Sequence, residues 1–461
     1  MTIVSSLIEK LGAHKIKVGE ALKERYIHIW KMDQPLSALC AVLPESTEDV
    51  SQILKLCHKA KQPIVIHGGL TNLVGNTETN GNEVVVSLEK MNKILEVDVD
   101  SRTLTAEAGV ILENVQTEAK NNNLLFPLNF GAKGSAQLGG IISNNAGGLR
   151  VLRYGMTRNL VLGLEAVLPD GTIISSMKKI IKDNSGYDLK QLFIGAEGTL
   201  GIVTKAVLKL VEAPKSRLSA FVGLNDYNNV VAFLKFMDAG FAGILSGYEL
   251  IWKNTYEVMT SSGSPSKPPL PYNYEYYVLV EILGSDQIKD LEKLETLLEV
   301  AFNEHIILDA AIASNASDLN WFWTIREDVH VLTSSTKNDQ HFDISLPIPL
   351  IGEVINGIRE ELMAIIDIDK VFSFGHVADG NIHFIIGKHH QSDELIHQIN
   401  EVIYSKLKAI GGSISAEHGV GVHKKGYLHY CRSESEMALM KILKKSLDPH
   451  LLLNRGKIFD I

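Results

Sequence analysis

The sequence predicts a two-domain fold that mixes α-helices and β-strands, of the α/β or α+β class. At 461 residues the chain exceeds the size at which a single hydrophobic core stops growing. Strand and helix patterns alternate through its first half, and from about residue 216 longer helices with apolar faces separate the strands. The change of pattern at the segment VEAPKS places a domain boundary near 214–216.

The first half of the chain predicts helices and strands in alternation. Residues 46–60 begin with Ser46 or Thr47 as N-cap, carry acidic residues in the first turn and repeat apolar residues on one face, which predicts a helix. The segment PIVIHGG then predicts a short buried strand that enters a glycine turn. Further strands are expected over 83–88, 93–100 and 103–110, and a helix over 110–122.

The second half predicts long helices between strands. Apolar residues at helical spacing predict helices over 226–239, 285–303, 316–333, 350–366 and 392–410. Strands are expected at YYVLVEIL (276–283) and VFSFGHV (371–377). The Ser- and Pro-rich stretch 261–271 predicts an irregular surface loop, with a lip of the active site as the alternative.

The composition argues against several classes of protein. A net charge of −9 without any Lys/Arg-rich run argues against nucleic-acid binding. Cys40, Cys57 and Cys431 lie far apart with no C-x-x-C pair, which argues against a disulfide framework and favours a reducing compartment. The N-terminus lacks secretory-signal features, and no apolar run approaches the ~18 residues of a membrane span. These observations predict a cytoplasmic enzyme, and contact with a membrane acceptor stays open.

Three glycine-rich segments predict a large cofactor that contains phosphate. They are HGGLTNLVGN (67–76), the stretch 126–155 and FIGAEGTLGIVT (193–204). Glycine lets backbone N–H groups approach a ligand closely, so two such loops can hold a diphosphate from both sides. None of the three has the ATP-binding fingerprint G-x-x-x-x-G-K-[ST], or G-x-G-x-x-G in the setting that nicotinamide cofactors require.

Motifs along almost the whole chain carry a resemblance. From about residue 35 onward they are GAKGSAQLGG, NNAGGLRVLRYG, GLEAVLPDG, DNSGYDLKQLFIGAEGTLGIVT, GHVADGNIH, AEHGVG and LDPHLLLNRGKIF. They resemble the flavoprotein family of D-lactate dehydrogenases, glycolate oxidase flavin subunits and D-2-hydroxyglutarate dehydrogenases, which shares the FAD-binding domain of vanillyl-alcohol oxidase and p-cresol methylhydroxylase (PCMH). The resemblance implies an α+β fold. Its parts would be a PCMH-type FAD-binding domain (1–215), an α/β substrate or cap domain with an antiparallel sheet (216–425), and a C-terminal segment returning to the FAD domain (426–461).

The resemblance also implies where FAD binds. One side of its diphosphate would be held by His67, Gly68, Gly69, Leu70, Thr71 and Asn72. The other side would be lined by Pro127, Gly131, Gly134, Ser135, Gly139, Gly140, Ser143, Asn145 and Ala146, while Glu197, Gly201 and Ile202 contact the adenosine part and Asn454 reaches the flavin end. Relatives usually carry Gly or Asn at position 70 and Gly at position 72, and some attach FAD through a His at position 70. Leucine there predicts noncovalent FAD.

Two loops with glycine neighbours predict a metal site. GHVADGNIH places His376 and His383 on either side of an A-D-G-N turn between apolar strands, so their side chains can converge. SAEHGVG adds Glu417 and His418, and two His with one Glu make an open site for a divalent ion. The resemblance assigns ligation to His376, His383 and Glu417, and proton abstraction to His418. Zinc is the first choice, and Fe(II) or Mn(II) share the ligand set. A plain hairpin turn at 379–381 is the alternative.

Polar residues around that site predict substrate contacts. Arg326, in WFWTIREDVH, either stacks on Trp323, pairs with Glu327, or clamps a carboxylate as the resemblance implies. Asn381 would also contact the substrate. His330 and His341 replace a Thr and a Lys that hold carboxylates in D-2-hydroxyglutarate enzymes, and protonated imidazoles can bind an anion. A frequent Asn of the family is replaced here by Ile385.

The resemblance implies an FAD-dependent, metal-assisted dehydrogenase that oxidises a D-2-hydroxy acid, with D-2-hydroxyglutarate as the first choice. D-lactate dehydrogenase and glycolate oxidase flavin subunit are the alternatives within the family. Rivals of other classes are a flavin-dependent transferase such as alkylglycerone-phosphate synthase, a non-enzymatic flavin subunit, and a nicotinamide dehydrogenase. The electron acceptor would be electron-transfer flavoprotein, a quinone or a cytochrome, and a homodimer is common among relatives.

Overall fold

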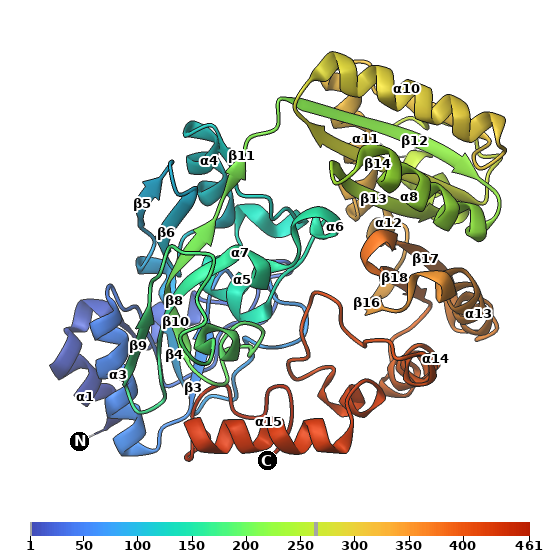
Figure 1. Cartoon of the computed structure of the whole chain (residues 1–461). Helices are drawn as coiled ribbons and strands as arrows, with labels where there is room; N and C mark the ends of the chain where they lie inside the picture. The colour runs from blue at the N-terminus through green and yellow to red at the C-terminus, as the bar shows by residue number, and fades with distance from the viewer. Residues whose placement is uncertain (1, 262–265) are drawn as a thin grey trace. The chain divides into compact units, whose positions relative to one another are not determined.

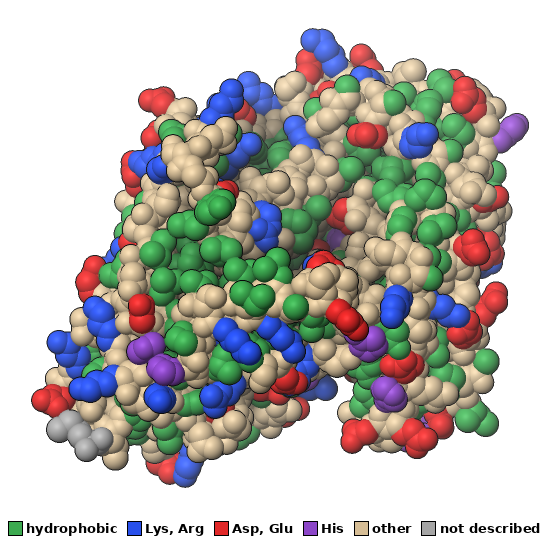
Figure 2. All heavy atoms as spheres, turned by 60° about the horizontal axis from the view of Figure 1, so that its bottom comes forward, with side chains coloured by type: hydrophobic (Ala, Val, Ile, Leu, Met, Phe, Trp, Pro, Cys, Tyr) green, Lys and Arg blue, Asp and Glu red, His purple; other side chains and the backbone are tan. Residues whose placement is uncertain are grey.

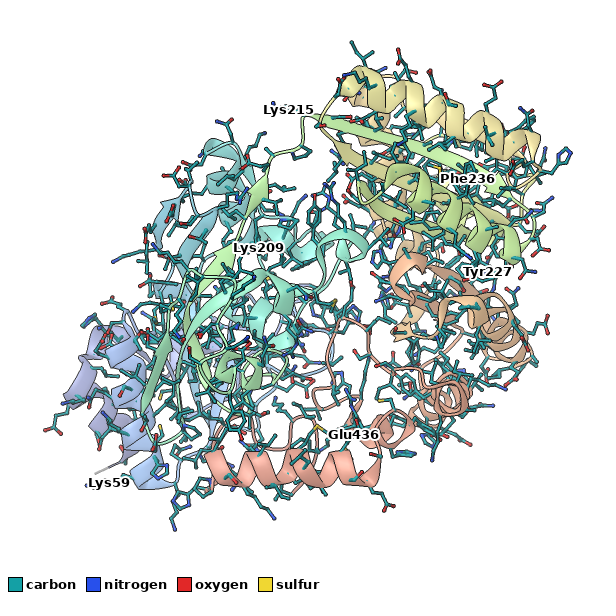
Figure 3. The ribbon with its side chains drawn as sticks, in the orientation of Figure 1. Lys59, Lys209, Lys215, Tyr227, Phe236 and Glu436 are labelled. Carbon is teal, nitrogen blue, oxygen red and sulfur yellow. The ribbon has the colours of Figure 1, made fainter. Side chains whose placement is uncertain are left out.

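A computed structural model describes residues 2–261 and 266–461, which form two compact units. The first unit comprises 2–147, 155–213 and 417–461, and the second comprises 148–154 and 214–416, without the undescribed 262–265. Lys209 at the end of β10 and Lys215 just before β12 mark where the chain passes from the first unit to the second (Figure 3). Part of the predicted loop 261–271 lies outside the described residues.

Besides a small two-stranded antiparallel sheet of β7 and β11, the first unit is built on two larger sheets (Figure 1). One has the order β1-β2-β4-β3, in which β2, β4 and β3 are parallel, and the other is antiparallel with the order β5-β6-β10-β8-β9. The strands are β1 (Ile16–Lys17), β2 (Cys40–Val42), β3 (Ile64–His67), β4 (Val84–Ser87), β5 (Ile94–Asp98), β6 (Thr103–Glu107), β7 (Leu124–Leu125), β8 (Val161–Val167), β9 (Ile173–Ser176), β10 (Ile202–Lys209) and β11 (Val211–Glu212).

Helices complete the first unit, and the C-terminal segment pairs with it. Leu453 forms a parallel bridge with Ile64 beside β3. Glu436 (Figure 3) closes a capping box with Ser433 at the beginning of α15. The α-helices are α1 (Ile3–Leu11), α2 (Glu20–Lys23), α3 (Thr47–Ala60), α4 (Leu112–Asn121), α5 (Leu138–Asn144), α7 (Thr157–Leu160) and α15 (Glu434–Leu447). The 3₁₀ turns are η1 (Ala13–Lys15), η2 (Leu88–Lys90), η3 (Gly131–Gly134), η4 (Leu189–Leu192) and η7 (Lys425–Tyr430).

The second unit is a seven-stranded antiparallel sheet covered by helices, with the strand order β15-β12-β14-β13-β17-β18-β16. The strands are β12 (Ser216–Leu224), β13 (Leu245–Trp252), β14 (Tyr276–Gly284), β15 (Asp309–Ile312), β16 (Asn338–Ser345), β17 (Ile368–His376) and β18 (Asn381–Lys388). The helices are α6 (Val151–Tyr154), α8 (Tyr227–Phe241), α9 (Lys253–Thr260), α10 (Gln287–Asn303), α11 (Ala316–Glu327), α12 (His330–Ser334), α13 (Ile351–Met363) and α14 (Asp393–Ile410), with the turns η5 (Ile348–Leu350) and η6 (Val377–Asp379).

The two faces of this sheet carry different helices. Successive strand residues point to opposite faces. The hydroxyl of Tyr248 therefore reaches α8, where it donates to the carbonyl of Val230, while Phe221 packs edge-on against Phe322 of α11. α8 and α10 lie side by side on one face in Figure 1. Glu249, next to Tyr248, consequently points to the face that α11 covers.

Most predicted elements are confirmed, and one predicted helix is divided. The mixed α and β composition, the alternation in the first half and the helices of the second half all occur at the expected places. The single helix expected over 316–333 is instead α11 and α12, because α11 ends at Glu327 and the backbone leaves helical geometry at the following Asp328. No helix within 2–261 or 266–461 has the length and hydropathy needed to span a bilayer.

Candidate functional site

A tight hairpin presents two histidines on one face of the second unit's sheet. β17 and β18 pair in antiparallel register, with Phe374 opposite His383 and His376 opposite Asn381. Between them lies η6, followed by Gly380, whose φ of +84° is a conformation that L side chains rarely adopt. The hairpin expected at GHVADGNIH is therefore confirmed, and the rings of His376 and His383 lie 5.2 Å apart between centroids.

The three predicted metal ligands lie together. One potential ligand atom from each of His376, His383 and Glu417 falls within 4.8 Å of the other two. The amide of Ala416, the residue before Glu417, donates to the Asp343 carboxylate at 3.0 Å. Two imidazoles and one carboxylate form a donor set that suits Zn²⁺, Fe²⁺ or Mn²⁺ and leaves coordination positions open. These residues therefore fit a divalent ion.

A buried carboxylate that the sequence did not reveal lies beside the hairpin. Glu249 on β13 is opposite His376 on β17, and its Oε1 accepts a 2.6 Å hydrogen bond from His376 Nδ1. Its Oε2 accepts from Arg326 Nε at 2.7 Å. Burial alone would raise the pKa of Glu249, but the facing His376 and Arg326 outweigh burial and hold the pKa below its ordinary value.

Neither of the predicted local partners contacts Arg326. Its guanidinium pairs with Glu249 and lies over the Phe374 ring at 4.8 Å, instead of stacking on Trp323 or pairing with Glu327. The local alternatives are thus wrong. Arg326 is 5% exposed, and its Nη groups make no hydrogen bond to a described residue.

Asn381 is a buried polar residue on the face of the sheet that carries His376 and His383. It is 4% exposed, and neither its amide oxygen nor its amide nitrogen has a hydrogen-bond partner among the described residues. Burying an amide without hydrogen-bond partners costs free energy, so a polar ligand beside His376 would satisfy it.

The two histidines predicted to contact the substrate lie on other elements of the second unit. His341 lies on β16 and pairs with Asp339 at 2.8 Å, and His330 begins α12.

Two predicted glycine loops lie side by side within the first unit. A Cβ on Gly69 would overlap the carbonyl oxygen of Ser135, and a Cβ on Gly68 would lie 3.7 Å from the amide nitrogen of Gly140. Gly140 itself faces open space. The Oε1 atom of Gln137 is buried there without a partner among the described residues. These features form a cradle of backbone and orphaned polar atoms, which suits a diphosphate.

His67 and Leu70 shape one wall of this cradle. Burial lowers the pKa of His67 to about 4, so its ring is neutral, and its Nδ1 has no partner in the described parts of the chain. Leu70 adopts a φ of +56°, the left-handed conformation that Gly or Asn accepts more readily. The loop keeps that conformation through two bonds: Ile29 donates to the Leu70 carbonyl and Trp30 to the Asn72 carbonyl.

Glu197 and Asn454 act on the backbone around the cradle. The carboxylate of Glu197 accepts from the amides of Val420 and Gly421 and from Asn76, and burial raises its pKa. The side chain of Asn454 accepts from the amide of Ile66 and donates to the Glu197 carbonyl. These contacts fix the loop that follows His418 and the end of β3. Direct contacts with a cofactor stay a prediction for both residues.

The remaining predicted cofactor residues are spread along the same unit. Gly131 and Gly134 are the first and last residues of η3; Gly139 and Ser143 lie in α5; Asn145 and Ala146 follow α5; Thr71 follows Leu70; Pro127 follows β7; Gly201 precedes β10; and Ile202 begins β10.

Two family matches together span most of the chain. Residues 38–176 match the FAD binding domain family, and residues 213–458 match the C-terminal domain of FAD linked oxidases. The second match alone covers more than half of the 461 residues.

Named relatives are similar over most of their length. A probable mitochondrial D-2-hydroxyglutarate dehydrogenase of Oryza sativa subsp. indica is 38% identical over 92% of this chain and 75% of its own. A putative mitochondrial D-lactate dehydrogenase of Schizosaccharomyces pombe is 38% identical over 89% of this chain and 80% of its own. The mitochondrial names contradict the expected cytoplasmic location, which was wrong. Few cysteines indicate a reducing compartment, and this signal does not distinguish the cytoplasm from other reducing compartments.

Solved structures share the fold at low sequence identity. An alkyldihydroxyacetonephosphate synthase superposes with a TM-score of 0.75 at 15% identity, covering 98% of this chain and 85% of its own. A p-cresol methylhydroxylase superposes with a TM-score of 0.74 at 14% identity, covering 99% and 96%. The predicted α+β, PCMH-type fold is confirmed.

Proposed function

Because the chain belongs to the FAD linked oxidase family and carries its FAD-binding domain, we propose that it oxidises a D-2-hydroxy acid to the 2-oxo acid, and that D-2-hydroxyglutarate is the preferred substrate. The observation that carries the proposal is the convergence of His376, His383 and Glu417. Within the second unit, Arg326 reaches the same His376 through Glu249. A metal site linked to an arginine suits a substrate with a hydroxyl and carboxylates.

The residues of the proposed site have separate roles in the oxidation of a secondary alcohol. His376, His383 and Glu417 would hold a divalent ion, with zinc as the first choice. When bound, the ion would supply Lewis acidity at the substrate hydroxyl, and FAD would supply the hydride acceptor. His418 takes the hydroxyl proton as general base, since the ring nitrogen of a neutral imidazole can accept a proton. Arg326 and Asn381 bind and orient the substrate's polar groups.

The electrons must then leave the flavin for an acceptor. Electron-transfer flavoprotein, a quinone or a cytochrome would fit this step. The face in Figure 2 intersperses Lys and Arg with Asp and Glu, so its described residues form no continuous basic track. That mixed surface suits a small-molecule enzyme better than a protein that binds a phosphate backbone.

FAD is expected to be bound without a covalent link. Leu70 occupies the position through which some relatives attach the flavin, and a leucine side chain has no nucleophile. Acid precipitation of the purified protein should therefore release all the yellow colour into the supernatant as FAD. Flavin that stays in the pellet would show a covalent bond elsewhere.

The substrate preference is tested with D- and L-2-hydroxy acids and a dye as electron acceptor. The flavin bands should bleach with D-2-hydroxyglutarate, and kcat/KM should be higher for it than for D-lactate. His330 and His341 offer the basic groups that a second carboxylate needs, although Ile385 removes a polar contact. A higher kcat/KM for D-lactate, or a preference for L-acids, would overturn this choice of substrate.

The same spectra separate the enzyme from its rivals. A flavin-dependent transferase or an inactive flavin subunit would keep its oxidised spectrum with every 2-hydroxy acid. The solved synthase shares the fold only, and its likeness at 15% identity carries no argument for its reaction. The family's GHxxDGNxH and AEHG motifs, present here as residues 375–383 and 416–419, favour the dehydrogenase.

A further inference from the structure

Glu249 joins two parts of the proposed site through a single buried group. It lies on β13, is fully buried, and each of its two oxygens accepts one hydrogen bond. One bond comes from the ring of His376, and the other from the guanidinium of Arg326. The carboxylate is therefore shared between a proposed metal ligand and the proposed substrate clamp.

The bond to His376 decides which ring nitrogen can bind a metal. Nδ1 donates its proton to Glu249, so Nε2 is the nitrogen that can offer a lone pair. A carboxylate in this position also fixes the plane of the ring and makes the imidazole a stronger ligand. The antiparallel register sets the distance, because Glu249 and His376 are directly opposite each other on β13 and β17.

The bond to Arg326 decides which of its N–H groups remain for a ligand. Nε is committed to Glu249, and the Phe374 ring supports the guanidinium at 4.8 Å. The Nη groups then form a fork that can bind a carboxylate. Phe374 also neighbours His383, with 5.3 Å between ring centroids, so the arginine and both histidines belong to one packed cluster.

We propose that Glu249 is a positioning residue that sets the geometry of metal ligation at His376 and of substrate binding at Arg326 together. This inference rests on the proposed function. Loss of its carboxylate should weaken both kinds of binding, since an amide has one acceptor oxygen and presents N–H groups to the second donor. A carboxylate that only stabilised the fold would affect unfolding and leave binding by the folded protein unchanged.

The chain provides a matched control in Glu281. This residue on β14 is also almost fully buried, and it also bridges two basic groups, Arg150 at 2.8 Å and Arg217 at 3.0 Å. Burial alone would raise the pKa of Glu281, but Arg150 and Arg217 outweigh it and hold the pKa below its ordinary value. It makes no contact with the two histidines, so Glu281→Gln tests the loss of a buried carboxylate by itself.

The experiment compares Glu249→Gln, Glu281→Gln and the unchanged FAD-loaded protein. Zinc affinity is measured by competition with a chelator, and binding of 2-oxoglutarate, as an analogue that cannot be oxidised, by the change in the flavin spectrum. Glu249→Gln is expected to weaken zinc binding by roughly 10–100-fold and 2-oxoglutarate binding by about 10-fold or more. Glu281→Gln should bind both as the unchanged protein does, although its Tm falls.

The outcomes separate this inference from the proposed function. If the unchanged protein binds zinc and Glu249→Gln binds it equally well, the positioning role is wrong while the metal site stands. If the unchanged protein binds no divalent ion, the proposed function itself fails. Should Glu249→Gln not fold, Glu249→Asp keeps the charge but is one methylene too short to reach both partners. Full zinc and 2-oxoglutarate affinity in that variant would also overturn the inference.

Discussion

Replacing His383 by alanine is expected to remove the metal ion and to abolish turnover while FAD stays bound. His383 is one of three groups whose ligand atoms lie within 4.8 Å of one another, so its loss leaves two protein ligands. Lewis-acid assistance at an alcohol is worth several kcal/mol, which corresponds to ~10³-fold or more in kcat. The cradle assigned to FAD lies in the first unit and contains no part of β18, so the flavin should be retained.

Elemental analysis and the visible spectrum, measured on the same sample, check both parts of this result. His390→Ala is the matched control, because His390 follows β18 but is exposed and pairs with Asp367 at 3.3 Å. That variant should keep both metal and activity. A His383→Ala protein with its full metal content, or with unchanged turnover, would contradict the assignment of His383 as a ligand.

The parts of the site that could be predicted are those formed by residues that lie close together in the sequence. The two histidines flank one short turn, and the pairing of β17 with β18 brings such residues together wherever the hairpin forms. The glycine loops could also be predicted from the sequence. The backbone of Gly69 approaches that of Ser135 so closely that no side chain fits between them, and only glycine allows this. Local sequence contains the information for both features.

Glu249 could not be predicted because its role depends on strand register. It is separated from His376 by 127 residues, and no motif marks it among the apolar residues of β13. Only the neighbouring placement of β13 and β17, with Glu249 opposite His376, gives the carboxylate its partner. A long-range contact also explains Arg326, which pairs with Glu249 of β13 and not with Trp323 or Glu327, its neighbours on α11. The buried guanidinium of Arg326 pairs with the buried Glu249 and not with the exposed Glu327.

Backbone contacts hold the His418 loop in place. Asn144 donates to the carbonyl of His418 at 3.0 Å, and the next two amides after Gly419 donate to Glu197. Gly419 has a φ of +83°, and a Cβ there would lie 2.9 Å from the Glu197 carboxylate. Because these contacts involve backbone atoms, an alanine at position 418 should leave the loop and the neighbouring Glu417 where they are.

His418→Ala is therefore expected to lower kcat by two or more decades, as the loss of a general base does, with metal content and flavin unchanged. Added imidazole should restore part of the rate, because it supplies the missing proton acceptor without any change in the loop. Glu417→Ala distinguishes the two roles: it should lose the metal and gain nothing from imidazole. A His418→Ala enzyme with near-normal kcat, measured by dye reduction at saturating D-2-hydroxyglutarate, would mean that the hydroxyl proton leaves by another route.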